Sequence, residues 1–153
     1  MEDWRRIDID ALDPESRLTD EQLRLVDTDL VSYDDVLLKS RQVKALLSKG
    51  NYSDSLRLAL TNPPYHSDIE DTRLFNLSLV LEVLTSVKQA QMSNIVQALD
   101  IDQQDILVKY LYKAMSQSQS QIHSGILLAW FEKTIEITGL GPILRYMSDR
   151  RLV

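Results

Sequence analysis

The sequence predicts an all-α protein with about seven helices in a compact bundle or superhelix, preceded by an extended acidic N-terminal arm. From residue 32 onward apolar side chains recur at three- and four-residue spacing, and no segment alternates as a strand would. The chain has only four glycines and four prolines, which favours short loops between regular elements. Residues 1–31 show no helical period. We therefore predict two parts, an arm over 1–31 and a helical core over 32–153.

The first two core helices have clear boundaries. Ser32 can cap a helix that ends at Lys49 and Gly50, a last-turn cation followed by a residue that tolerates the left-handed conformation. A shorter helix is expected over 53–60, and the prolines of "NPP" at 62–64 stop it. The side chains expected to face the core are Val36, Leu37, Val43, Leu46, Leu47, Leu56, Ala59 and Leu60.

The third helix is expected to be the central one. Ser67 and Glu70 have the S-x-x-E spacing of a capping box at its start. Its apolar residues cover most of its circumference, which is typical of a helix with neighbours on several sides. These residues are Leu74, Phe75, Leu77, Val80, Leu81, Leu84 and Val87.

The remaining helices follow in quick succession. A short one is expected over about 93–99, and Asp102 is expected to cap the next. A polar loop at 116–121 precedes a helix that ends at Gly139, and Pro142 suits the first turn of a last helix. The residues expected to face inward are Ile95, Val96, Leu99, Ile106, Leu107, Tyr110, Leu111, Ile122, Ile126, Leu127, Trp130, Ile135, Ile143, Leu144 and Met147.

The charge distribution excludes some classes of partner. The net charge is −6, yet residues 1–35 hold 12 acidic against 4 basic side chains, and residues 36–153 hold 11 against 13. Nucleic acids and anionic membranes select basic surfaces, so we expect neither as a partner. The chain has no cysteine, and residues 1–15 lack the apolar run of a secretory leader, so we expect a cytoplasmic protein.

The sequence offers little for catalysis or for binding a cofactor. No Walker loop, G-x-G-x-x-G or G-x-S-x-G motif occurs, and neither His66 nor His123 has a second ligand one helical turn away. The acidic run Asp8, Asp10 and Asp13 fails as a calcium loop, because it lacks an oxygen ligand at position 5 and glycine at position 6. We expect a protein that is not an enzyme and holds no metal.

The opening "WRRIDIDA" is the first candidate for binding a partner. In an extended chain three of its apolar side chains fall on one side and its charged side chains on the other, behind the apolar anchor Trp4. The apolar set is Ile7, Ile9 and Ala11, and the charged set is Arg6, Asp8 and Asp10. A frayed acidic terminus is the alternative. Disordered tails usually lack tryptophan and β-branched residues, so the pattern favours a peptide that lies on another protein.

The run "LVKYLYK" at 107–113 is the second candidate. With Leu107 and Tyr110 turned inward, Lys109, Tyr112 and Lys113 share the opposite face of the helix. That face suits a contact patch for a partner, and it suits an ordinary solvated face equally well.

Several motifs together resemble the family of the smallest, fifth subunit of the actin-related protein 2/3 complex. They are "WRRIDIDALDPES", "NPPY", "LEVLTSVKQA", "DILVKYLYKAMS", "GILLAWFEK" and "SDRRLV", and the resemblance runs from Trp4 to Val153. It implies a non-catalytic structural subunit of a complex that nucleates branched actin filaments in the cytoplasm, at the actin cytoskeleton and its cortical patches. The core would pack on the fourth subunit near the β-propeller subunit, and nucleotide would belong to the actin-related subunits.

The resemblance also implies roles for two groups of residues. The arm would tether an actin-related subunit through Trp4, Arg5, Arg6, Ile7, Asp8, Ile9 and Asp10. The core motif is matched by Lys109, Tyr110, Tyr112 and Lys113. About thirty extended residues at roughly 3.3 Å each reach on the order of 100 Å, enough to cross to a neighbouring subunit. A free-standing helical-repeat adaptor is the alternative, suggested by "GNYSDSLRLAL" at 50–60, although no 34-residue period recurs.

Overall fold

The computed structural model describes residues 31–65, 70–117, 124–149 and 153, and within them it contains seven helices and no strand. The prediction of an all-α fold is therefore confirmed. The helices are α2 (Tyr33–Ser48), α3 (Tyr52–Leu60), α4 (Glu70–Ser86), α5 (Gln89–Ala98), α6 (Ile101–Ser116), α7 (Ser124–Thr138) and α8 (Gly141–Ser148). The predicted arm at 1–31 lies outside the described residues except for Val31, so its extended form stays a prediction.

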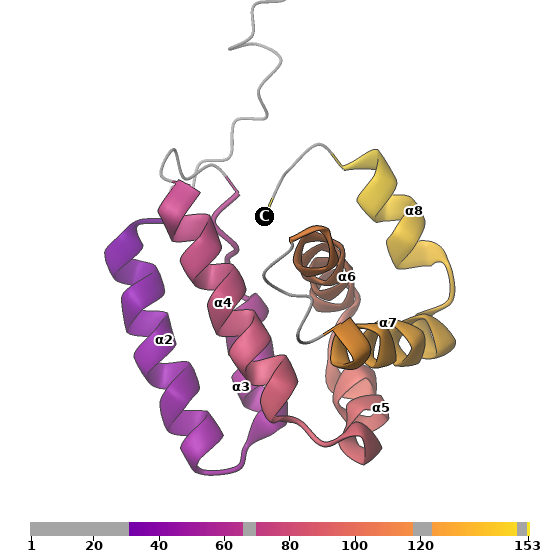
Figure 1. Ribbon diagram of the computed structural model, residues 1–153, viewed down its shortest axis with the longest axis horizontal. Coiled ribbons are helices and arrows are strands. Elements are labelled where there is room, and N and C mark those ends of the chain that lie inside the picture. The colour runs from indigo at the N-terminus through magenta and orange to yellow at the C-terminus, as the bar shows by residue number, and fades with distance from the viewer. Residues whose placement is uncertain (1–30, 66–69, 118–123, 150–152) are drawn as a thin grey trace, which may run out of the picture.

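The helices form two groups that meet in one core. Helices α2, α3 and α4 pack on one another, and α7 packs against α5, α6 and α8 (Figure 1). Contacts of α3 and α4 with α6, and of α4 with α7, join the groups. Helix α4 contacts α2, α3, α6 and α7, so it has neighbours in both groups, as its apolar circumference indicates.

The first helix begins and ends where the sequence indicates. The Ser32 hydroxyl oxygen accepts a hydrogen bond from the backbone N–H of Asp35 (3.2 Å), and the Asp35 carboxylate accepts one from the backbone N–H of Ser32 (3.2 Å). This capping box satisfies amides that have no partner inside the helix. At the other end Gly50 has a φ of 74°, a conformation that glycine adopts without strain.

Two predicted boundaries are wrong. The N-cap of α6 is Asp100 and not Asp102. The Asp100 carboxylate accepts a hydrogen bond from the backbone N–H of Gln103 (2.7 Å), and the Gln103 side-chain oxygen accepts one from the backbone N–H of Asp100 (3.3 Å). Asp102 lies inside the first turn, where the negative charge of a carboxylate interacts favourably with the helix dipole. Helix α5 begins at Gln89, four residues before the predicted start. The capping box predicted at Ser67 lies outside the described residues.

Trp130 occupies the interior, as predicted. Its side chain is fully buried, and its indole N–H donates to the backbone oxygen of Leu84 at 3.0 Å. This hydrogen bond ties α7 to α4 and satisfies the one polar atom of a large apolar side chain. Leu74, by contrast, is 40% exposed at the start of α4.

The predicted orientation of α8 is wrong. Leu144 and Met147 were expected to face inward, but they are 66% and 76% exposed. Leu140, just before the helix, is 66% exposed as well. Within α8 only Pro142 is buried. The physical reason lies in the polar contacts that attach this helix to α6.

Candidate partner-binding surfaces

The predicted site residues of the arm lie outside the described residues. They are Trp4, Arg5, Arg6, Ile7, Asp8, Ile9 and Asp10. Their role in binding a partner stays a prediction. The two histidines at 66 and 123 also lie outside the described residues.

Lys109 is not on an exposed face, contrary to the prediction. Its side chain is only 5% exposed, and its ammonium lies 2.5 Å from the Asp149 carboxylate, whose side chain is 17% exposed. The same ammonium lies 4.7 Å from the centre of the Tyr65 ring, a cation–π geometry. Lys109 therefore joins α6 to the end of α8 and to the segment after α3. The partner of the Lys109 ammonium, Asp149, is 40 positions further along the chain.

Tyr112 also packs within the chain. Its ring stacks on Tyr146 of α8, with the ring centres 4.5 Å apart and the planes 4° from parallel. It meets Phe131 of α7 edge-on at 5.4 Å. Lys113, in the same turn of α6, is half-buried. The proposed contact face thus consists largely of residues at the junction of α6, α7 and α8, and any contact of Lys109, Tyr112 or Lys113 with a partner stays a prediction.

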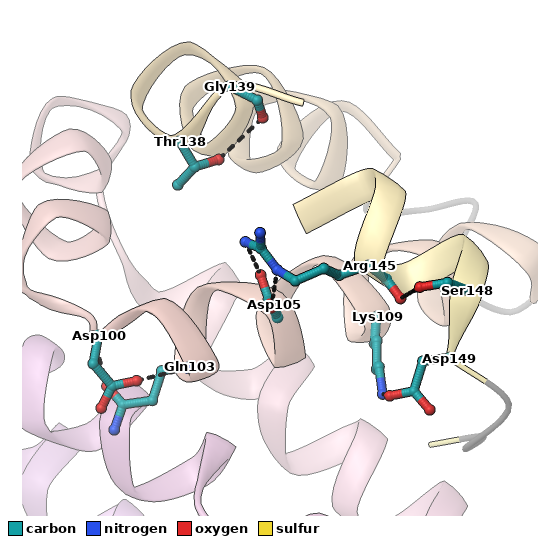
Figure 2. A network of polar contacts seen from close by, with 9 residues as sticks. All are labelled: Asp100, Gln103, Asp105, Lys109, Thr138, Gly139, Arg145, Ser148 and Asp149. Carbon is teal, nitrogen blue, oxygen red and sulfur yellow. Dashed lines mark hydrogen bonds and ion pairs between the residues drawn. The ribbon is translucent and has the colours of Figure 1, made fainter. Parts of the chain in front are cut away.

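Two ion pairs join α6 and α8 like rungs (Figure 2). The Arg145 guanidinium donates to both carboxylate oxygens of Asp105, at 2.5 and 2.8 Å, and this hydrogen bonding raises the pKa of Arg145. Lys109 and Asp149 form the second rung, four residues further along both segments. The two helices therefore run in the same direction. The matching patterns D-x-x-x-K at 105–109 and R-x-x-x-D at 145–149 are the sequence signal for this pairing, and the predicted orientation of α8 did not take it into account.

The rungs explain why the apolar residues of α8 face outward. Because residues in an α-helix turn by about 100° each, a helix that aims Arg145 at α6 rotates Leu144 away from that contact. Leu140, Leu144 and Met147 recur at spacings of four and three, so they form one line along α8. We call these three residues the α8 stripe. It is an exposed apolar surface with the periodicity of a helix that packs on a partner.

A cleft of about 350 Å³ lies beside the rungs. It is lined by Tyr65, Asp102, Asp105, Ile106, Lys109, Arg145 and Asp149. Both cations in it, Lys109 and Arg145, already bind carboxylates.

A second set of polar side chains links α2, α4 and α6 in the interior. The Lys39 ammonium donates to the backbone oxygens of Thr61 (2.7 Å) and Asn62 (3.2 Å) and to the side-chain oxygen of Asn76 (3.4 Å). The Asn76 amide in turn donates to the Tyr110 hydroxyl. Burial lowers the pKa of Lys39 to about 8 and raises that of Tyr110. Each of these side chains is hydrogen-bonded to another segment of the chain, so together they link the helices.

The residues that the structure describes contain neither a metal site nor a membrane-spanning helix. No group of three histidine, aspartate or glutamate residues there is placed to hold a metal ion. None of the helices in 31–65, 70–117 and 124–149 is both long and apolar enough to cross a membrane.

Comparison with known proteins agrees with the resemblance found in the sequence. A family model described as the ARP2/3 complex 16 kDa subunit (p16-Arc) matches residues 3–153. Actin-related protein 2/3 complex subunit 5 of Saccharomyces cerevisiae is 43% identical over 152 residues, covering 99% of this chain and 98% of the yeast protein. Subunit 5-B of Xenopus laevis is 33% identical and the human subunit 5-like protein 32%, each over 98% of this chain and 94% of the relative. The chain belongs to the p16-Arc family of ARP2/3 complex 16 kDa subunits.

Proposed function

We propose that this chain is a non-catalytic structural subunit of an actin-related protein 2/3 complex, which nucleates branched actin filaments in the cytoplasm. Its helical body docks on the fourth subunit near the β-propeller subunit, and its N-terminal arm tethers an actin-related subunit. Full-length similarity to proteins named as subunit 5 of this complex supports the assignment. The complex acts at the actin cytoskeleton, including cortical patches.

The observation that carries the docking proposal is the α8 stripe. Leu140, Leu144 and Met147 are 66%, 66% and 76% exposed, next to a well-packed core. Burying a large apolar side chain stabilises an association by roughly 1–2 kcal/mol when it starts out largely exposed. A surface of this kind suits the apolar centre of an interface in a permanent complex.

The arm acts as a tether. Its apolar residues Ile7 and Ile9 and the anchor Trp4 occupy pockets on the actin-related subunit, while Asp8 and Asp10 face away. The body anchors the arm near its target, so docking of the actin-related subunit becomes an intramolecular step with a high effective concentration.

The docking proposal is tested by capturing the complex through another subunit and measuring how much of this chain comes with it. Leu144→Asp combined with Met147→Asp should abolish most of the recovery, because charges enter the buried interface. Leu38→Asp is the matched control, since Leu38 is 55% exposed on α2, and it should leave recovery unchanged. Equal recovery of both variants would contradict docking through α8. A native chain that elutes alone at 17.6 kDa would favour the adaptor alternative.

The tether is tested by deleting residues 1–12 from the chain in the assembled complex. We expect normal incorporation of the shortened chain and weaker retention of the actin-related subunit. The variant Trp4→Ala with Ile7→Asp should reproduce the effect if apolar contacts hold the arm. Full retention of the actin-related subunit by both variants would refute the tether.

A further inference from the structure

Helix α8 is attached to the body by few apolar contacts. Pro142 is its only buried residue, and Tyr146 adds a stacking contact with Tyr112. The Arg145 side chain is 52% exposed, so its ion pair with Asp105 is partly solvated. A helix of eight residues with so little burial is not stable by itself. Its position therefore depends on contacts at its ends.

The strongest such contacts come after the helix. Asp149, directly behind α8, binds the buried Lys109. Val153, four residues further on, is only 5% exposed and belongs to the same hydrophobic cluster as Trp130. The C-terminus accordingly lies back over the helical body (Figure 1). Val153 thus lies in the core.

We propose that Asp149 and Val153 form a C-terminal latch that holds α8 against α6 and thereby presents the α8 stripe to its partner. Asp149 supplies the charged contact to Lys109, and Val153 supplies the apolar contact. Opening the latch frees the end of α8, so the stripe loses its fixed orientation. The consequence for docking rests on the function proposed above, whereas the latch itself is a property of the free chain.

Hydrogen exchange of the full-length chain tests the latch directly. Val153→Asp should speed exchange in α8 by about tenfold to hundredfold, since it removes the burial of one valine. Exchange in α3, whose residues Leu56 and Leu60 are fully buried, should not change. Val153→Ala serves as a milder variant, with a smaller increase confined to α8. Unchanged exchange in α8, or an equal increase in α3 with both variants, would overturn the latch.

Capture of the complex with the same variants separates the two proposals. Faster exchange in α8 with reduced recovery supports both the latch and docking through α8. Faster exchange with full recovery upholds the latch in the free chain and contradicts its proposed effect on docking. If exchange does not change, the latch is refuted, and docking is then decided by the double variant at Leu144 and Met147.

Discussion

Removing Asp149 and removing Lys109 should destabilise the fold unequally, although the two residues form one ion pair. Asp149→Ala leaves an ammonium that is 5% exposed against the face of Tyr65. An uncompensated buried charge of this kind costs about 3–5 kcal/mol. Lys109→Met keeps most of the apolar stem and leaves a carboxylate with 17% exposure, which can turn towards water. We expect that change to cost only about 1–2 kcal/mol.

The double variant makes the asymmetry sharper. Adding Lys109→Met to Asp149→Ala removes the stranded charge, so the double variant should be more stable than Asp149→Ala alone. The coupling energy between the two sites should be about 1–3 kcal/mol. Asp149→Asn is the matched control, because it removes the charge and keeps a hydrogen-bond acceptor, and its cost should fall between those of the two single variants.

Urea denaturation followed by far-UV circular dichroism measures these free energies of unfolding. Equal costs for the two single changes would refute the reasoning, because they would show that the Lys109 site is as well hydrated as the Asp149 site. Strict additivity in the double variant would show that the two groups do not interact.

Three other predictions concern the core and the helix ends. Burial lowers the pKa of Lys39 to about 8 from 10.5, so the unfolded chain binds more protons in that window, and the free energy of unfolding should rise from about pH 8 to about pH 10.5. Lys39→Met should remove this rise in urea titrations at several pH values. Trp130→Phe should cost about 2 kcal/mol by calorimetry, since it removes the hydrogen bond to the backbone of Leu84 and leaves a cavity. Asp100→Ala should cost about 1 kcal/mol in urea and Asp102→Ala clearly less, because only Asp100 caps α6; equal costs would contradict that assignment.

Much of the fold could be predicted from the sequence, because helix boundaries depend on nearby residues. The cap at Ser32, the turn at Gly50 and the stop before Pro63 all act within a few positions. Asp100 was missed because Asp102 offers the same chemistry two residues later, and only the return contact from Gln103 distinguishes them.

The errors at α8 and Lys109 have a different physical origin. Helical periodicity shows that Leu144 and Met147 form one apolar line, but it does not show whether the chain's own core or another protein covers it. The burial of Lys109 depends on Asp149, a contact across 40 residues that no local pattern contains. Complementary charges spaced four residues apart, in α6 and from Arg145 of α8 to Asp149 just after it, are the one sequence signal for both features.

Hydroxyl-radical footprinting of the free chain and the assembled complex tests the central claim most directly. Met147 is 76% exposed in the chain, and Met115, which is 36% exposed on α6, serves as an internal reference. The proposed docking predicts that assembly strongly reduces the oxidation of Met147 relative to Met115. If Met147 is oxidised at the same rate in the complex as in the free chain, the helical body does not dock through α8.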